Sequence, residues 1–327
     1  MNFGFFEILT LVGSLGFFIY GMKIMSEGIQ KLAGAKMRSV LGAITNNKFA
    51  GILTGFFTTS VIQSSSATTV MIVSFVNAGI LSLRQAIGVI MGANIGTTVT
   101  AFLVLGLGFG KLSLATYALP LIALGLPLIF FKKDLFSSLG DFIIGFALLF
   151  MGLEALKASV PSFDQGGFYN LIEPLTNHGI FSVIIFVFVG TFVTILVQSS
   201  SAAMALTLVL CTKGLSFEFA AAIVLGENIG TTITANIAAI IGNIHAKRAA
   251  LAHLIFNIIG VLWMLVFFYF FIENIEYIVK TNSDWFPFDT STKESFESST
   301  IQWSLALFHL TFNIINTFFL VWFVKNI

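Results

Sequence analysis

The chain has 327 residues, of which 57% are hydrophobic and only 9% are charged, and its formal net charge is +1. Soluble globular domains carry about 25% charged residues, so this chain cannot cover a water-facing surface and most of it must lie in a lipid bilayer. The charge balance excludes a basic surface for nucleic acid. The single cysteine, Cys211, excludes an intrachain disulfide and disfavours a metal cluster.

Breaks and charged residues delimit the predicted membrane spans, because periodicity is uninformative where every face is apolar. Seven spans are expected, at residues 5–31, 84–108, 113–131, 137–159, 217–241, 247–272 and 301–325. The first lacks a basic start and a small-residue cleavage site, so it is not a signal peptide. Two further apolar stretches, 49–80 and 180–212, have polar centres. This pattern suits re-entrant helical hairpins with tips at membrane depth.

The same polar sequence motifs occur twice and in the same order. The run "QSSSA" begins at Gln63 and again at Gln198, and "GANIGTTVTA" from Gly92 recurs as "GENIGTTITA" from Gly226. Each half therefore reads as a span, a hairpin and a span that carries Asn-Ile-Gly-Thr-Thr. Three crossings separate the two copies, and an odd number turns the second copy upside down. We therefore expect inverted repeats whose hairpin tips meet near the midplane of the membrane.

The predicted fold is an all-α polytopic membrane protein with two inverted repeats. Residues 1–134 form the first repeat, 135–275 the second, 276–300 an extracellular loop and 301–327 a last span. Basic residues flank the spans on one predicted side and acidic residues fill the loop on the other. By the positive-inside rule the amino terminus is outside and the carboxyl terminus is cytoplasmic, in a multi-pass protein of the plasma or inner membrane.

The two serine runs are predicted to bind an oxyanion. Unpaired hydroxyl groups in hydrocarbon cost several kcal/mol each, so clustering them at two matched depths indicates a ligand. The second arm of each hairpin also points the positive end of its helix dipole at the tip. Neither run contains Lys or Arg, so a co-bound cation is expected to neutralise the anion. The predicted donors are Ser64, Ser65, Ser66, Ser199, Ser200 and Ser201.

The Asn-Ile-Gly-Thr-Thr words are predicted to bind a small hard cation such as Na⁺. Gly96 and Gly230 permit a break in the helix, and unwound carbonyl groups beside a break are suitable oxygen ligands. Gln63 and Gln198 could add amide oxygens. Glu227 stands where the first copy has Ala93, and its carboxylate could bind Na⁺ or take up a proton.

Structural explanations compete with these assignments. Ser- and Thr-rich stretches also serve as packing surfaces between membrane helices, although packing does not require Gln and Asn-Ile-Gly-Thr-Thr at fixed offsets. Lys23 and Glu27, at positions i and i+4 of the first span, could simply pair with each other. The "HLIFN" and "HLTFN" words place His253 and His309 in spans, where a neutral histidine bonded between helices is the commoner outcome.

These motifs resemble the type II sodium–phosphate cotransporter family, and especially its short bacterial members. The likeness covers nearly the whole chain, through "GMKIMSEGIQKLAG", "QSSSATTV", "GANIGTT", "QSSSA", "GENIGTT" and "KRAALAHLIFN". The resemblance implies an elevator-type transporter that carries inorganic phosphate with Na⁺ by alternating access. It implies phosphate at the six serines and sodium at Gln63, Gln198, Asn228, Thr231 and Thr234. We also assign Asn94 and Thr97 to the predicted phosphate site and Glu227 to the predicted sodium site.

The sequence departs from that family in three places. Vertebrate-like members have Ser where this chain has Glu227. The region "LATYALPLIALG" lacks the aspartate that those members carry, which leaves the sodium stoichiometry open. The chain also ends without the helical regulatory domain of some bacterial relatives.

Other functions remain open at this stage. A phosphate exporter, or a carrier of sulfate or a carboxylate, would use the same architecture. A serine hydrolase is disfavoured, because neither serine run contains a base that could activate a nucleophile. We therefore expect no enzyme and no organic cofactor, with phosphate, Na⁺, the lipid bilayer and a second copy of the chain as partners.

Overall fold

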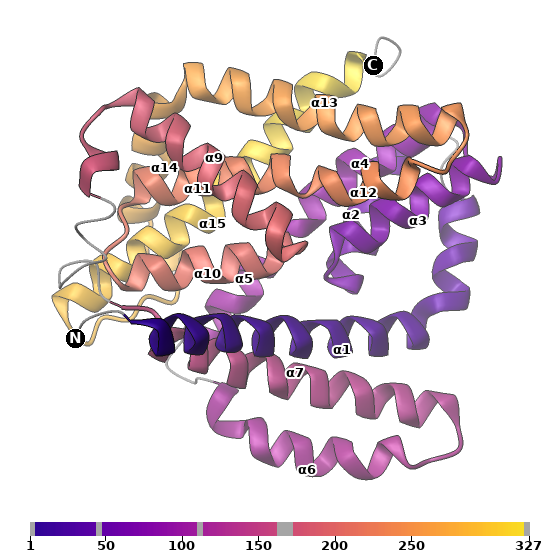
Figure 1. Cartoon of the computed structure of the whole chain (residues 1–327), viewed down its shortest axis with the longest axis horizontal. Helices are drawn as coiled ribbons and strands as arrows, with labels where there is room; N and C mark the ends of the chain where they lie inside the picture. The colour runs from indigo at the N-terminus through magenta and orange to yellow at the C-terminus, as the bar shows by residue number, and fades with distance from the viewer. Residues whose placement is uncertain (1–3, 44–47, 110–113, 162–172, 324–327) are drawn as a thin grey trace.

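The computed structural model describes residues 4–43, 48–109, 114–161 and 173–323, and these residues form helices and connecting loops without a β-strand (Figure 1). Within the described residues, six helical segments are long and apolar enough to cross a membrane. They are Phe5–Ala33, Leu83–Phe109, Asp134–Ser159, Ile180–Val197, Ile244–Val266 and Lys293–Phe323. The protein is thus an all-α polytopic membrane protein, as the composition predicted.

The first half contains a long helix, a hairpin and an interrupted span. Its helices are α1 (Phe5–Ala43), α2 (Lys48–Ile62), α3 (Ser65–Asn77), α4 (Leu83–Thr97), α5 (Val99–Val104) and α6 (Ala118–Ile129), with a π-helical turn at Leu105–Phe109. The predicted hairpin 49–80 corresponds closely to α2 and α3. The predicted span 84–108 is divided at Thr98.

The second half repeats this order. Its helices are α7 (Asp134–Ser159), α9 (Ile180–Val197), α10 (Ser200–Thr212), α11 (Phe217–Gly230), α12 (Thr232–Ala239), α13 (Ile244–Val266), α14 (Phe268–Thr281) and α15 (Lys293–Leu320). The hairpin 180–212 corresponds to α9 and α10, and the span 217–241 is divided at Thr231.

The loop before the last span differs from its predicted bounds. The expected loop 276–300 is shorter, because α14 continues to Thr281 and α15 begins at Lys293 after an N-cap at Thr292. Helix α14 forms because its buried residues recur at helical spacing, from Phe268 through Ile272 and Ile275 to Val279. The predicted last span ran beyond residue 323, outside the described residues.

Matching glycines bring the first arm of each hairpin against the following helix. A methyl group at Gly55 would overlap the Val89 carbonyl group of α4, and one at the equivalent Gly190 would overlap the Ile223 carbonyl group of α11. Gly92 and Gly226 make the reciprocal contacts with α2 and α9. Small residues allow such close backbone approach in membranes, where apolar burial does not drive association between helices. The two halves therefore share one packing geometry.

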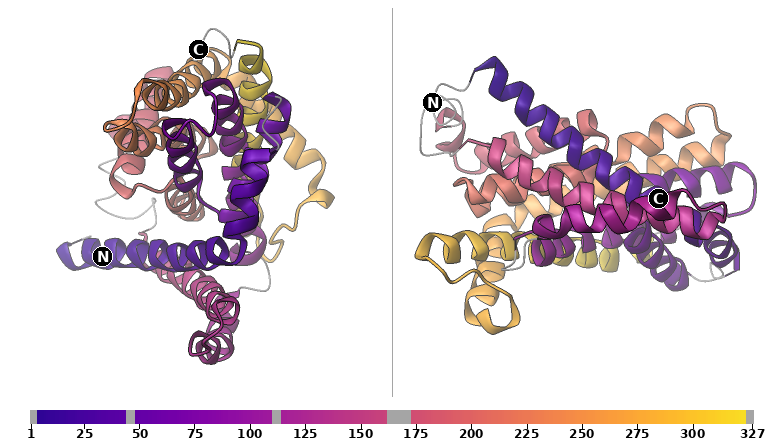
Figure 2. Two further views of the ribbon diagram at one scale, coloured as in Figure 1. Left: turned by 90° about the vertical axis from the view of Figure 1, so that its right-hand side faces the viewer. Right: turned by 90° about the horizontal axis from the view of Figure 1, so that it is seen from below.

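The helices α1, α6 and α7 form a layer along one side of the other helices (Figures 1 and 2). Helices α1 and α7 run antiparallel, since Gly21 lies against the backbone of Leu149 while Gly152 lies against that of Phe18. These two glycines are equivalent in the repeat, so the antiparallel contact places the two copies in opposite directions. The hairpins likewise enter from opposite ends of the molecule, with α2 and α3 on the right of Figure 1 and α9 and α10 on the left.

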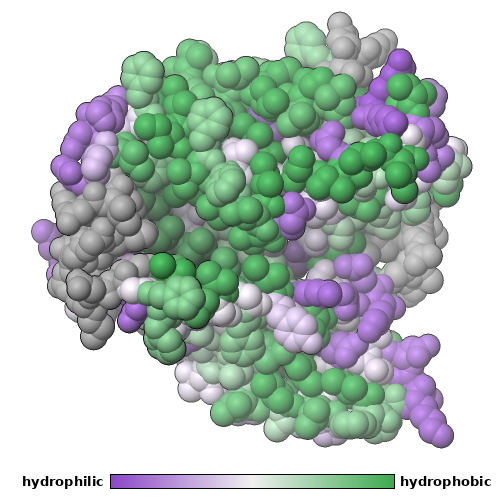
Figure 3. Space-filling model, viewed as in Figure 1, coloured by the Kyte–Doolittle hydropathy of each residue, from purple (hydrophilic) through white to green (hydrophobic). Residues whose placement is uncertain are grey.

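The visible surface is apolar across most of its middle, and hydrophilic residues gather mainly toward its left and right edges (Figure 3). Large exposed side chains such as Phe188, Phe192 and Leu262 lie on helices of the bundle. This is the surface expected where lipid chains are the solvent.

Candidate functional site

The two hairpin tips share one local conformation. Gln63 and Gln198 end the first arms with φ values of 57° and 56°, the only positive φ angles of non-glycine residues in the described chain. Ser64 and Ser199 then cap the second arms, and their hydroxyl oxygens accept hydrogen bonds from Ala67 N and Ala202 N, both at 3.2 Å. Left-handed backbone at a glutamine is uncommon and concentrates at functional sites.

The tips meet inside the molecule. The hydroxyl oxygens of Ser65 and Ser200 lie 3.4 Å apart although 135 residues separate them. A second link joins the halves, because the Thr100 hydroxyl on α5 lies 3.3 Å from the Ser201 hydroxyl. Ser65, Ser200 and Ser201 are buried, whereas Ser64, Ser66 and Ser199 are partly exposed. The structure thus brings the six predicted serines together.

Each glutamine amide has a fixed orientation. The Gln63 Oε1 atom accepts a hydrogen bond from Thr100, and the Gln198 Oε1 atom accepts one from the equivalent Thr234, both at 3.0 Å. The amide nitrogens donate to the ends of their own helices, to Ser60 O and Ile195 O. Both Oε1 atoms keep a second lone pair for a ligand. The two differ in burial, since Gln63 is buried and Gln198 is exposed.

A cavity of about 410 Å³ opens over the tips, and α1 forms its opposite wall. Ser26 on α1 donates a hydrogen bond to Ile62 O at the end of α2, at 2.7 Å, and Gln30 donates to the Ser26 hydroxyl at 3.0 Å. The lining residues are Ile19, Met22, Lys23, Ser26, Glu27 and Gln30 of α1, with Gln63 to Ala67 and Val197 to Ser201 of the hairpins.

Two predicted phosphate ligands do not line this cavity. Asn94 is buried, and its amide contacts His253 at 3.2 Å and Asn257 at 3.4 Å on α13. The Thr97 hydroxyl donates back to Ala93 O at 3.0 Å. The Asn94 amide is instead hydrogen-bonded to α13, a helix that the repeated motifs do not include.

Some of the predicted sodium ligands lie at the cavity and others lie away from it. Gln63 and Gln198 line the cavity, and Thr234 reaches it through Gln198. Asn228 donates to Val224 O of its own helix, at 2.8 Å. The Thr231 hydroxyl is buried without a hydrogen-bond partner among the described residues.

Glu227 lies on α11 and is hydrogen-bonded to α10. It is 1% exposed, and its Oε1 atom accepts a hydrogen bond from Thr207 at 2.8 Å. Its Oε2 atom has no hydrogen-bond partner among the described residues. A buried carboxyl group with one unsatisfied oxygen is costly, which indicates a role beyond packing.

The breaks in α4 and α11 differ from the prediction. Thr98 and Thr231 keep helical backbone angles, and the hydroxyl groups of Thr98 and Thr232 donate to Ile95 O and Ile229 O, both at 2.7 Å. The carbonyl groups beside the breaks are therefore partly satisfied. Gly96 and Gly230 serve close packing, since a methyl group at either would lie 2.6 Å from a carbonyl oxygen of the neighbouring arm.

Sequence reasoning interpreted Thr100 as a helix-packing residue, and it missed the wall formed by α1. Thr100 could have been found, because it occupies the repeat position of Thr234, which the sequence did single out. The contribution of α1 depends on how two distant segments pack, and the repeat words contain no signal for it.

Comparison with known proteins decides the family. A family profile described as Na+/Pi-cotransporter matches residues 17–158 and again residues 159–279. The chain belongs to the Na+/Pi-cotransporter family. The double match agrees with the two copies of the hairpin and glycine contacts described above.

Two relatives of this Na+/Pi-cotransporter family member are named as phosphate transport proteins. The chain is 29% identical over 272 residues to "Putative inorganic phosphate export protein YjbB" of Escherichia coli (strain K12), a match that covers 82% of this chain and 48% of the relative. It is 39% identical over 100 residues to sodium-dependent phosphate transport protein 2B of Homo sapiens, covering 30% of this chain and 14% of that protein.

The chain spans about half the length of the phosphate export proteins that it matches. An uncharacterized protein, YqeW of Bacillus subtilis, is 29% identical over 273 residues, with 80% of this chain and 82% of the relative covered. No solved structure matched the chain.

Proposed function

We propose that the protein is a secondary transporter that carries inorganic phosphate together with Na⁺ by alternating access. The observation that carries this proposal is the convergence of the two serine tips, with Ser65 and Ser200 in contact at 3.4 Å and a cavity directly over them. Family membership supports phosphate as the substrate and transport as the activity.

Phosphate binds at the tips because donors converge there from both halves. The backbone N–H groups of Ser65 and Ser66, and of Ser200 and Ser201, lie in the first turns of α3 and α10, where helical partners are missing. Together with the serine hydroxyl groups they surround a tetrahedral anion from two directions, and both helix dipoles point at it.

Sodium binds beside the anion, at the amide oxygens of the two glutamines. Oxygen ligands suit a hard cation, and the pairs Gln63–Thr100 and Gln198–Thr234 present a carbonyl oxygen and a hydroxyl oxygen together. A cation there neutralises the phosphate, since the serine runs contain no basic residue. This charge compensation couples the two substrates. Asn228, Thr231 and Glu227 contribute from behind the second tip.

Alternating access follows from a division between α1, α6 and α7 on one side and the hairpins with α4, α5, α11 and α12 on the other. We call these the scaffold layer and the hairpin unit. The bond from Ser26 to Ile62 O joins them, and Lys157 of α7 donates at 2.6 Å to Gly108 O, in the π-helical turn that follows α5. Such few polar contacts can exchange when one unit slides against the other, as in inverted-repeat transporters.

Uptake of radiolabelled phosphate into proteoliposomes tests the proposal. Uptake should require an inward Na⁺ gradient and persist in the presence of sulfate. Ser65→Ala and Ser200→Ala should each abolish it with unchanged amounts of protein in the membrane. Wild-type uptake by either variant would overturn the two-tip site, and uptake without Na⁺ would overturn the coupling.

Export is a second candidate, favoured by the names of the bacterial relatives. The same site can run outward if the cellular gradients drive it, because secondary transport is reversible. Cells that express the protein should then lose preloaded phosphate faster than cells that express Ser200→Ala. Net accumulation of phosphate under physiological Na⁺ would support uptake instead.

The proposed location is the cell membrane, with the amino terminus outside. In Figure 1 the loops between α3 and α4, α6 and α7, and α12 and α13 lie on the right. Lys132 lies in the second of these loops, and Arg84 and Lys247 lie in the first turns of the helices that follow the other two. The loop between α14 and α15, with Asp284, lies on the left. The positive-inside rule assigns the right-hand side to the cytoplasm. Labelling of Lys133→Cys from inside only, and of Ser291→Cys from outside only, would support this orientation.

A further inference from the structure

One face of α1 carries the charged side chains of the cavity. The α1 residues that line it recur at helical spacing, at positions 19, 22, 23, 26, 27 and 30. Among all the described lining residues, Lys23 is the basic one and Glu27 the acidic one. The hairpins contribute only neutral side chains and backbone groups. The net charge balance in the cavity is therefore set by two residues of the scaffold layer.

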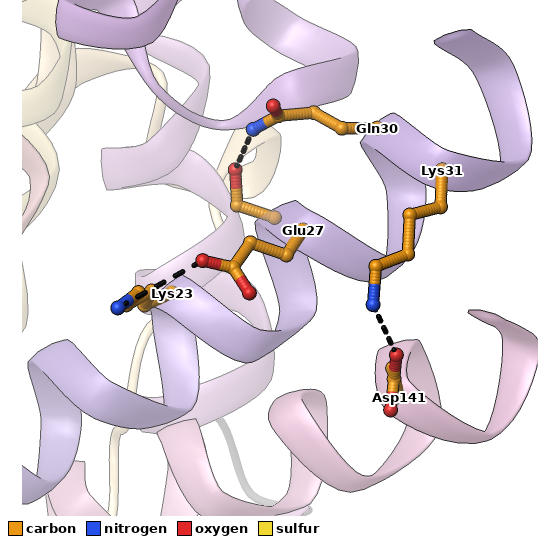
Figure 4. Close-up of polar contacts among 6 residues, drawn as sticks. Lys23, Glu27, Gln30, Lys31 and Asp141 are labelled. Carbon is orange, nitrogen blue, oxygen red and sulfur yellow. Dashed lines mark hydrogen bonds and ion pairs between the residues drawn. The ribbon is translucent and has the colours of Figure 1, made fainter. Parts of the chain in front are cut away.

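The contact between these two residues is loose. Lys23 Nζ lies 3.9 Å from Glu27 Oε1, and the side chains are 66% and 51% exposed. An ordinary charged hydrogen bond would be about 2.8 Å long. The pair Lys31 and Asp141 achieves such a bond at 2.9 Å. Figure 4 shows Lys31 turned toward Asp141 on α7, while the Lys23–Glu27 contact runs along α1 on another side of the helix.

We propose that Lys23 is an anion-binding residue of the cavity and that Glu27 is its counter-ion when no oxyanion is bound. The proposal rests on the proposed function of the tips and adds a cationic contact to it. A loose exposed ion pair contributes little stability, so an incoming anion can replace the carboxylate at small cost. The hydroxyl groups then fix the geometry of the oxyanion, and Lys23 selects for its charge.

The position of Lys23 on α1 has a consequence for transport. The serines belong to the hairpin unit and Lys23 belongs to the scaffold layer, so the ammonium group can contact the anion only while the tips face this part of α1. When the hairpin unit moves, the anion leaves Lys23, and Glu27 regains its partner. Lys23 thereby raises the affinity of the conformation described here over that of the opposite one.

Binding of [33P]phosphate to the purified detergent-solubilised protein tests the inference. Even at about 6 Å, which is further than a direct contact, one positive charge in a dielectric constant near 80 changes the affinity for a doubly charged ion about tenfold. Lys23→Met should therefore raise the dissociation constant about tenfold, and Lys23→Arg should keep it near the wild-type value. Glu27→Gln should lower it about threefold, because the competing carboxylate is gone.

Lys31→Met is the matched control, since it removes a lysine from the same helix that does not line the cavity. It should leave phosphate binding unchanged. If the wild type binds phosphate and Lys23→Met binds it equally well, Lys23 is not an anion contact although the proposed function stands. If the wild type binds no phosphate, the proposed function itself fails. If Lys23→Met does not fold, Glu27→Gln decides, and unchanged or weaker binding by that variant overturns the inference.

Discussion

Replacing Gly96 by alanine should damage the binding site through packing alone. Gly96 lies on α4 where it crosses the end of α2, and a methyl group there would lie 2.6 Å from the Phe56 carbonyl oxygen and 2.8 Å from the Thr59 Cβ atom. Neither obstacle is the flexible end of a side chain. The two helices must therefore separate for the methyl group to fit.

The size of the effect follows from these distances. Ordinary contact begins near 3.4 Å, so the distance from 2.6 Å must grow by about 0.8 Å. The same displacement one turn further along would stretch the bond between Thr100 and Gln63 from 3.0 Å to about 3.8 Å, beyond hydrogen-bonding range. Overpacking costs about 1–3 kcal/mol and the lost hydrogen bond about 1 kcal/mol. The higher helix propensity of alanine offsets less than about 1 kcal/mol of this loss of stability.

Thermal unfolding of the purified protein and the KM for phosphate in proteoliposomes measure the two effects. Gly96→Ala should lower the unfolding temperature by a few degrees and raise the KM at least fivefold, and the equivalent Gly230→Ala should act in the same direction. Gly16→Ala is the control, because nothing lies within 4 Å of a methyl group there. A Gly96→Ala protein with the unfolding temperature and KM of the wild type would refute the packing argument.

Three further substitutions test individual contacts. Thr100→Val keeps the shape of the side chain but removes the hydroxyl that contacts Gln63 and Ser201, so the KM for phosphate should rise about five- to tenfold, and an unchanged KM would place these bonds outside the site. Ser26→Ala removes the bond from α1 to the first tip, about 1 kcal/mol, and should change the maximal uptake rate more than the KM; the reverse pattern would argue against a contact between moving units. Glu227→Gln should raise the KM for Na⁺ severalfold at an unchanged amount of protein, and an unchanged Na⁺ dependence would make Glu227 structural.

The hairpins could be predicted from the sequence because the conformation of each tip depends on residues that are adjacent in the chain. Ser64 and Ser199 are strong N-cap residues, and the polar run at each tip interrupts an apolar stretch near its middle. The convergence of the tips also followed, since it depends only on the repeat and on an odd number of crossings.

The side-chain partners could not be predicted in the same way, because they come from elements outside the repeated words. Asn94 was assigned to the anion site from the sequence, and in the structure its amide is buried. Only the packing of α13 shows that His253 and Asn257 contact it. Gly96 was expected to relax the backbone of α4, but its neighbours show that it is needed for the close approach of α2.

The two halves are alike at the hairpin tips and differ away from them. At the tips the serines and their caps are nearly identical, which suits one anion held on the axis between the halves. Away from the tips the second half has Glu227 and Thr207 where the first has Ala93 and Ile72. These two changes occur together, since the Thr207 hydroxyl donates to the carboxyl group of Glu227. A symmetric cation site would need no such pair in one half alone. Under the proposed function, we therefore expect the distinctive cation chemistry in the second half, and the anion at the serines that both halves share.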